Sequence, residues 1–177
     1  MSNFRFIDCN VDVSKILQQV LDNPEDWKAV GTYENTGGNK NPYGFLPLVM
    51  GVVESAEDDI KNSELTRPTP LLEKYTEAVE WLKSQGFTKI SRCAFFRLQP
   101  GGEVPSHIDN GTYYLTRDRY HLSLQGEYEY TCGEETHLIK PGTFFWFDNK
   151  NYHNAKNISN VDRITLVFDV PHSPSNP

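Results

Sequence analysis

Apolar residues recur at helical spacing in two segments of the first half of the chain. Val13–Leu21 carries its apolar side chains on one face and is predicted to form a short helix, which Asn23-Pro24 ends. Pro70–Gln85 shows the same period over a longer span and is predicted to form a second helix, with Gly86 as its left-handed C-terminal stop. The single apolar stripe of this longer helix predicts that it packs on a sheet.

The pattern changes from helical spacing to alternation after Lys89. Short runs rich in aromatic and β-branched residues are separated by Gly and Pro, and each is predicted to be a strand. These runs are Ser91–Gln99, Arg119–Leu124, Tyr128–Thr131, Thr143–Phe147 and Arg163–Val170. Several short strands at near-regular spacing favour an antiparallel sandwich or barrel. We therefore expect one domain over residues 1–177, with a helical and irregular part over about 1–88 and a β core over about 89–170.

The remaining segments carry no catalytic pattern. Phe45–Val53 is a short apolar run and is predicted to be a strand, whereas Thr32–Tyr43 is polar and turn-rich and is predicted to be a surface loop. Glu54–Arg67 is charged and is expected to be irregular or partly helical, and Pro171–Pro177 is expected to be disordered. The candidate chemistry therefore lies in the β core.

Composition and charge exclude several classes of function. The chain has 177 residues, and its 17 Lys and Arg against 24 Asp and Glu give a formal net charge of −7. Because it has no run of Lys and Arg, neither a nucleic acid nor an anionic membrane is an expected partner. An N-terminus without an apolar leader, and no segment long enough to cross a bilayer, favour a soluble, cytoplasmic protein. Cys9, Cys93 and Cys132 show no C-x-x-C spacing and are expected to be free thiols.

His107, Asp109 and His153 form a candidate metal site. His107 and Asp109 are two positions apart, so on a strand both side chains project from one face toward a single ion. An H-x-D pair alone also occurs in surface turns. His153, which follows an aromatic strand, adds a third potential ligand to the pair. Two imidazoles and one carboxylate are the ligand set of non-haem Fe(II) oxygenases, and they leave coordination positions open for other ligands. The three residues are therefore candidate metal ligands and the candidate catalytic centre.

Arg163 is a candidate anion-binding residue. It opens the last alternating run and shares one face of that strand with Thr165 and Val167. A dicarboxylate that chelates iron at one end needs a partner for its distal carboxylate, and a guanidinium forms a planar two-bond pair with such a group. An Arg that points into a β core is otherwise costly. A charged residue at a sheet edge, paired with the adjacent Asp162, is the alternative that the sequence leaves open.

In this order and spacing, the residues resemble the signature of the Fe(II)/2-oxoglutarate-dependent oxygenases, and among these the aspartyl/asparaginyl β-hydroxylase family is the most similar. The stretches that carry the resemblance are RLQPGGEVPSHID, RYHLSL, PGTFFWFDNKNYHNAKN and DRITLVFDVPH. They span the chain from about Ser91 to His172. The resemblance implies a mainly β fold with flanking helices, namely a double-stranded β-helix of the jelly-roll, cupin-like type.

The resemblance also implies roles for individual residues. The three candidate ligands match the iron-binding positions, although some family members lack the carboxylate. Arg163 matches the anchor for the distal carboxylate of 2-oxoglutarate, and Arg119 and His121 match an Arg-x-His pair that touches this co-substrate. Phe96 stands where a small hydroxyl residue often assists, so that contact is missing or comes from another residue.

The implied activity is a dioxygenase reaction that uses Fe(II), 2-oxoglutarate and O2 to hydroxylate a C–H bond of an amino acid. The expected substrate is an Asp or Asn residue in a protein or peptide, or a free amino acid such as proline. The alternative is a metal-binding jelly roll without oxygenase activity, such as a cupin-like isomerase or a ligand-sensing module. Such proteins do not need an Arg at position 163, so Arg163 discriminates between the two functions.

Other polar residues have weaker claims to a role. His137, in a predicted polar turn, and His172, in the tail, are expected at the surface. Arg97 is expected at an exposed edge, with the substrate as its alternative partner. Tyr113 and Tyr114 either line the entrance of the site or lie exposed in a loop.

Overall fold

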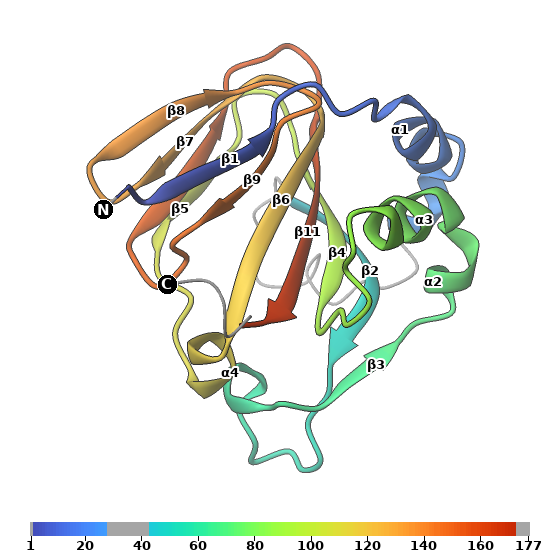
Figure 1. The fold of residues 1–177 in the computed structure, drawn as a ribbon, viewed down its shortest axis with the longest axis vertical. Coiled ribbons are helices and arrows are strands. Elements are labelled where there is room, and N and C mark those ends of the chain that lie inside the picture. The colour runs from blue at the N-terminus through green and yellow to red at the C-terminus, as the bar shows by residue number, and fades with distance from the viewer. Residues whose placement is uncertain (1, 28–42, 173–177) are drawn as a thin grey trace, which may run out of the picture.

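Two antiparallel sheets face each other, and helices cover the outer side of the larger one (Figure 1). The computed structural model describes residues 2–27 and 43–172. The larger sheet contains, in spatial order, β1 (Phe4–Asp8), β9 (Phe144–Phe147), β6 (Arg117–Gln125), β11 (Arg163–Pro171), β4 (Cys93–Leu98), β2 (Tyr43–Gly51) and β3 (Thr66–Pro68). The smaller sheet contains β5 (Glu103–His107), β10 (His153–Asn157), β7 (Tyr128–Cys132) and β8 (Glu135–Ile139).

From β4 onward the chain passes from one sheet to the other at every connection except the one between β7 and β8. This alternation winds the strands into a double-stranded β-helix, in which two sheets enclose a common interior. The fold is therefore mainly β, of the jelly-roll, cupin-like type, as the sequence predicts. Strand β2 and the segments from Cys93 to Leu98 and from Arg163 to Pro171 also match their predicted runs.

The helical segments match the predictions in part. The first helix is confirmed as α1 (Ser14–Leu21) and the C-terminal stop as Gly86, which has a φ of 83°. The prediction of one helix over Pro70–Gln85 is wrong, because α2 (Leu71–Lys74) and α3 (Thr76–Ser84) are separated at Tyr75, where φ is −90° and ψ is 60°. The Tyr75 side chain is fully buried, and its hydroxyl donates a 2.8 Å hydrogen bond to Asp26 Oδ2.

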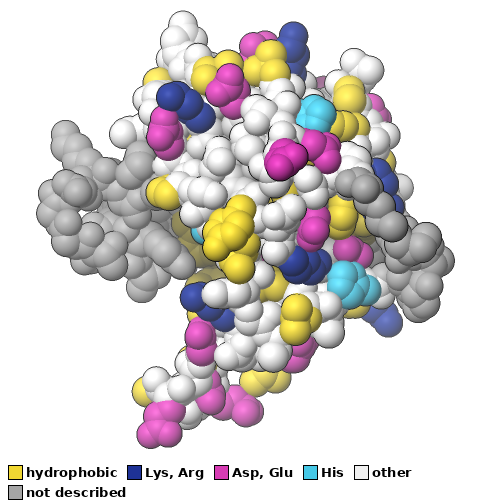
Figure 2. All heavy atoms as spheres, turned by 90° about the vertical axis from the view of Figure 1, so that its left-hand side faces the viewer, with side chains coloured by type: hydrophobic (Ala, Val, Ile, Leu, Met, Phe, Trp, Pro, Cys, Tyr) yellow, Lys and Arg dark blue, Asp and Glu magenta, His cyan; other side chains and the backbone are white. Residues whose placement is uncertain are grey.

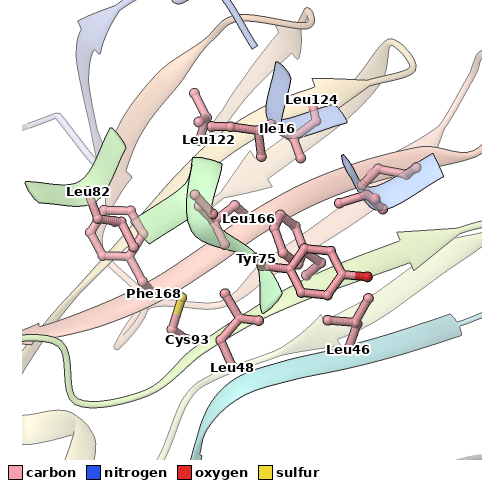
Figure 3. Close-up of a cluster of buried hydrophobic side chains, with 14 of the residues drawn as sticks. Ile16, Leu46, Leu48, Tyr75, Leu82, Cys93, Leu122, Leu124, Leu166 and Phe168 are labelled. Carbon is pink, nitrogen blue, oxygen red and sulfur yellow. The ribbon is translucent and has the colours of Figure 1, made fainter. Parts of the chain in front are cut away.

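Two apolar clusters hold the layers together. One lies between the helices and the larger sheet, where α1 and α3 contribute Ile16 and Leu82 and β11 contributes Leu166 and Phe168 (Figure 3). The other lies between the two sheets and includes Phe4, Tyr128, Tyr130, Cys132, Ile139, Phe145, Phe147 and Ala155. Alternate residues of β9 belong to opposite clusters, because successive side chains of a strand point to opposite faces, whereas β6 and β11 give only even-numbered residues, all to the first cluster. The even-numbered residues of β11 face the helices, and its odd-numbered residues face the smaller sheet.

Several elements were not predicted from the sequence. Strands β1, β5, β8 and β10 and the short helix α4 (Thr112–Leu115) are absent from the predicted set. The prediction of a polar turn at His137 is wrong, because His137 lies in β8. Its ring packs edge-on against Phe4, with a ring-centroid distance of 4.7 Å. Glu54–Arg67 contains a 3-10 turn at Ile60–Asn62 and then the start of β3, close to the expected irregular character.

The predicted loop over Thr32–Tyr43 lies outside the described residues except for Tyr43, which begins β2. Of the predicted tail, Pro171 ends β11 and only His172 beyond it is described. All three cysteines are free thiols, as expected. Among the described helices, none is long and apolar enough to cross a membrane. Figure 2 shows the face on the side of the smaller sheet, where acidic and basic side chains are interspersed.

Candidate metal centre

The ends of two neighbouring strands bring His107, Asp109 and His153 together. His107 is the last residue of β5 and His153 is the first residue of β10, and the two are register partners with rings 4.2 Å apart. The expectation that Asp109 shares a strand with His107 is wrong, because Asp109 lies in the loop after β5, where its N–H donates to the carbonyl of Asn149. One potential ligand atom from each of the three side chains lies within 4.8 Å of the others.

Both imidazoles present a nitrogen lone pair toward the centre of this group. The Nδ1 of His107 lies 2.8 Å from the carbonyl oxygen of Pro105, and the Nδ1 of His153 lies 2.9 Å from that of Asn151. A carbonyl oxygen only accepts hydrogen bonds, so each Nδ1 carries the proton and each Nε2 is left with its lone pair. Burial also lowers the pKa of His153, which keeps the ring neutral near pH 7. Neutral rings held in this way are typical of histidines that bind metals.

The Asp109 carboxylate completes the donor set with one oxygen. Its Oδ2 accepts hydrogen bonds from Arg119 Nη1 at 2.7 Å and from Asn149 Nδ2 at 2.9 Å. Its Oδ1 lies 4.0 Å from the Nε2 of His107. Burial raises the pKa of Asp109, but Arg119 and Asn149 outweigh burial, so the pKa lies below its ordinary value. The group is therefore an ionised carboxylate, and two imidazoles with one such carboxylate suit a divalent metal ion such as Fe(II).

Asp169 belongs to this site but was not predicted from the sequence. It lies on β11 with 1% of its surface exposed, and both of its oxygens pair with Arg119 on β6, at 2.7 Å from Nε and 2.9 Å from Nη2. The hydroxyl of Tyr113 donates to Asp169 Oδ2 at 3.1 Å. An acidic residue in the apolar run Leu166–Val170 is the signal that could have found it, because a buried carboxylate needs a partner.

A cavity of about 110 Å³ lies beside the three side chains, between the two sheets. His107, His153 and Arg119 line one part of it, and apolar side chains such as Phe147 and Val167 line another. His121 also faces this cavity and is buried among the rings of Tyr130, Phe145 and Phe147. Burial, with two nearby guanidinium groups, places the pKa of His121 well below its ordinary value, so this ring is uncharged.

Arg163 lines the same cavity as a buried cation. It is 4% exposed, its guanidinium lies 4.2 Å from the centre of the Tyr128 ring, and it makes no hydrogen bond or ion pair with any described residue. The alternative pairing with Asp162 is wrong, because Asp162 instead lies 3.9 Å from the Nε of Arg97. A buried guanidinium without a carboxylate partner is a site for an anion.

Two buried hydroxyls lie near Arg163 on the same face of the larger sheet. Ser123 on β6 and Thr165 on β11 are register partners, both are fully buried, and neither hydroxyl has a hydrogen-bond partner among the described residues. Phe96, the register partner of Thr165 on β4, also lines the cavity. Unpaired buried hydroxyls are rare, and beside a guanidinium they can donate to a bound carboxylate.

Two further predictions of site residues are settled by their contacts. The Arg97 side chain is 39% exposed, as expected, and it lines the cavity while its guanidinium packs over Trp27, 4.8 Å from the ring centre. Tyr113 does not lie exposed at an entrance, because it is fully buried and Arg92 packs 3.6 Å from its ring centre. His172 is partly exposed, as expected, and pairs with Asp118 at 3.0 Å.

Comparison with known proteins places this site within a described family. A model of the family described as aspartyl/asparaginyl beta-hydroxylase matches residues 12–173 of the chain, and no curated protein matches it. Among solved structures, a predicted oxalate decarboxylase from Thermotoga maritima is 22% identical over 51% of this chain and 74% of that chain, with a TM-score of 0.41. The Schizosaccharomyces pombe Cnp3 cupin domain is 19% identical over 48% of this chain and 55% of that one, with a TM-score of 0.41.

Proposed function

The chain belongs to the aspartyl/asparaginyl β-hydroxylase family, and from this membership we propose that it is a dioxygenase that uses Fe(II), 2-oxoglutarate and O2. One observation carries the proposal: His107 and His153 line the same cavity as the unpaired cation Arg163, and Asp109 completes their donor set. A donor set alone suits many metal proteins. A metal donor set together with a buried anion site suits a co-substrate that chelates the metal at one end and carries a carboxylate at the other.

The residues of the chain divide the work of holding this co-substrate. His107, Asp109 and His153 would hold the iron through Nε2, Oδ1 and Nε2, the atoms that their other hydrogen bonds leave available. Arg163 would pair with the distal carboxylate of 2-oxoglutarate. When bound, the iron couples the oxidation of 2-oxoglutarate by O2, to succinate and CO2, with conversion of a substrate C–H bond into C–OH.

The hydroxyls of Ser123 and Thr165 complete the anion site. The family resemblance places a small hydroxyl residue at position 96, where this chain has Phe96. Thr165 is the register partner of Phe96, Ser123 lies opposite Thr165 on the next strand, and neither hydroxyl has a partner among the residues that the structure describes. We expect them to donate hydrogen bonds to the distal carboxylate in place of the missing contact.

Several of the remaining wall residues are apolar. Phe147, Val167 and Tyr130 line the cavity with apolar surface, which excludes water from a bound oxidant. No side-chain acid or base is required for a C–H hydroxylation of this kind. The neutral state of His121 agrees with a role in packing or hydrogen bonding rather than in charge balance.

We propose an amino acid as the substrate, either an Asp or Asn residue in a protein or peptide or a free amino acid such as proline. The family description supports the first choice. A partly exposed His107, with 44% of its side chain accessible, makes the metal site reachable from solvent. A site that is accessible from solvent suits both kinds of substrate, and the assay described next distinguishes between them.

Succinate release tests this function directly. The purified protein is incubated with Fe(II), 2-oxoglutarate and O2, together with Asp or Asn peptides or with free amino acids, and succinate and hydroxylated product are measured by mass spectrometry. We expect one substrate class to raise succinate release, with a matching mass increase of one oxygen. Binding of Fe(II) without binding of 2-oxoglutarate contradicts the proposal and supports the cupin-like isomerase or ligand-sensing alternative.

A further inference from the structure

We propose that Arg119 and Asp169 are positioning residues for Asp109, which they hold so that only its Oδ1 can bind the metal. This inference rests on the proposed function, because it concerns the metal that the three side chains would hold. It gives Arg119 a task different from the co-substrate contact that the family resemblance implies.

The geometry of the ion pairs supports this role. Arg119 and Asp169 are register partners on β6 and β11, and the guanidinium meets the carboxylate side-on, through Nε and Nη2. This two-bond contact fixes the plane of the guanidinium. The remaining nitrogen, Nη1, then points at Asp109 Oδ2, 2.7 Å away. The direction of that hydrogen bond is therefore set by Asp169, a residue with 1% exposure that lies outside the donor set.

Asp169 is itself fixed from the other side. The hydroxyl of Tyr113 on α4 donates to its Oδ2 at 3.1 Å, and Tyr113 is fully buried beneath the guanidinium of Arg92. The hydrogen bonds thus form a chain from Tyr113 through Asp169 and Arg119 to Asp109. Tyr113 and Asp169 are buried, and the side chains of Arg119 and Asp109 are only 18% and 9% exposed, so water replaces a lost partner at a cost.

The consequence concerns the number of coordination positions. A carboxylate can bind a metal through one oxygen or through both. With Oδ2 held by Arg119 and Asn149, Asp109 offers a single oxygen, Oδ1. Two imidazoles and one oxygen leave open the positions that a chelating co-substrate and O2 require. A carboxylate that turned both oxygens to the ion would occupy one of these positions.

Metal titration in the absence of 2-oxoglutarate separates this role from a co-substrate contact. Co(II), whose visible spectrum reports its coordination, is titrated into the wild-type protein and into Asp169→Asn and Arg119→Lys. We expect both variants to bind Co(II) about 10- to 100-fold more weakly, the usual effect of losing a partner of a metal ligand, and to show a changed visible spectrum. The double variant is expected to lose little more than either single variant, because both act through one chain of contacts.

Asp118→Asn is the matched control. Asp118 is also a buried carboxylate on β6, 7% exposed, but it lies one residue from Arg119 and therefore on the opposite face, where it pairs with His172 and with the indole of Trp146. We expect its Co(II) affinity to stay within about twofold of wild type, by the independence of separate sites. Thermal unfolding of each variant checks that the fold is retained. If Asp169→Asn does not fold, Arg119→Lys and Tyr113→Phe decide the same question.

The outcomes distinguish the inference from the proposed function. If the wild-type protein does not bind Co(II) at these residues, the proposed function itself is wrong. If the wild-type protein binds Co(II) and the folded variants bind it equally well but lose affinity for 2-oxoglutarate, Arg119 contacts the co-substrate and the inference is overturned. Weaker Co(II) binding by the folded variants, with the control unchanged, supports it.

Discussion

Replacing Arg163 with Met separates a ligand-binding role from a structural one. The change removes a buried guanidinium and leaves an apolar side chain of similar length against the ring of Tyr128. In the absence of a ligand, the guanidinium makes no hydrogen bond with the described part of the chain, so the variant breaks none. We therefore expect opposite effects on ligand binding and on stability.

The size of each effect follows from the environment of the residue. A guanidinium that meets a carboxylate makes two charge-assisted hydrogen bonds, each worth about 1.5–3 kcal/mol. Their loss weakens the binding of 2-oxoglutarate by at least about 3 kcal/mol, or roughly 100-fold in Kd. A buried charge without a partner costs stability, and Met removes that cost at the loss of a cation–π contact of about 1 kcal/mol. The free energy of unfolding is therefore expected to stay equal or to rise by up to about 2 kcal/mol.

Two measurements on one variant test both expectations. Calorimetric titration of 2-oxoglutarate into the Mn(II)-loaded protein gives the Kd, and urea unfolding gives the free energy of unfolding. Arg67→Met is the control, since Arg67 is an exposed arginine on the edge strand β3, outside the residues that line the cavity, and is expected to leave the Kd unchanged. A ligand-binding role for Arg163 is contradicted if Arg163→Met binds 2-oxoglutarate within about threefold of wild type. It is equally refuted if the variant loses more than about 2 kcal/mol of stability, because Arg163 would then be structural.

Three further predictions concern stability. Burial and nearby guanidinium groups lower the pKa of His121, so below about pH 6.5 this residue takes up a proton in the unfolded chain but not in the folded chain. The free energy of unfolding should therefore fall by about 1 kcal/mol per pH unit below 6.5, and urea titrations of His121→Phe should show a smaller slope. Gly111 has a φ of 111°, and a Cβ there would collide with the carbonyl of Lys61, so Gly111→Ala should lower the free energy of unfolding by about 1–3 kcal/mol. It should also weaken Co(II) binding, because Gly111 lies in the loop that follows Asp109; unchanged thermal unfolding and unchanged Co(II) binding would contradict this. Tyr75→Phe removes the hydrogen bond to buried Asp26 and should lower the free energy of unfolding by about 1–2 kcal/mol; an unchanged value would show that the bond contributes nothing.

The sequence predicts the strands with several buried apolar residues and misses those that have at most one buried residue, such as β1, β5 and β8, or mostly polar buried residues, such as β10. β11 alternates between two buried faces, and its apolar residues make the period plain. β10 is also half-buried, but two of its buried residues are polar. His153 belongs to the donor set, and Asn157 donates hydrogen bonds to the backbone carbonyls of Leu98 and Val161. Hydrophobic periodicity does not register a strand of this kind.

The candidate site was also predicted only in part from the sequence. The residue types and their order identify His107, Asp109, His153 and Arg163 as candidates, because two imidazoles and a carboxylate suit a metal ion and a guanidinium suits the carboxylate of a co-substrate. The pairing of Arg119 with Asp169 depends on the register of β6 with β11, which no local pattern encodes. The break in the helix lies at Tyr75, whose hydroxyl bonds to Asp26, a tertiary contact that no local pattern encodes either.

Crystals soaked with Mn(II) and 2-oxoglutarate test the central claim most directly, through an anomalous difference map collected at a wavelength where Mn(II) scatters strongly. We expect one strong peak bound by His107 Nε2, Asp109 Oδ1 and His153 Nε2, with density for a chelating 2-oxoglutarate whose distal carboxylate meets Arg163. A metal peak away from these three atoms, or co-substrate density that does not reach Arg163, would contradict it.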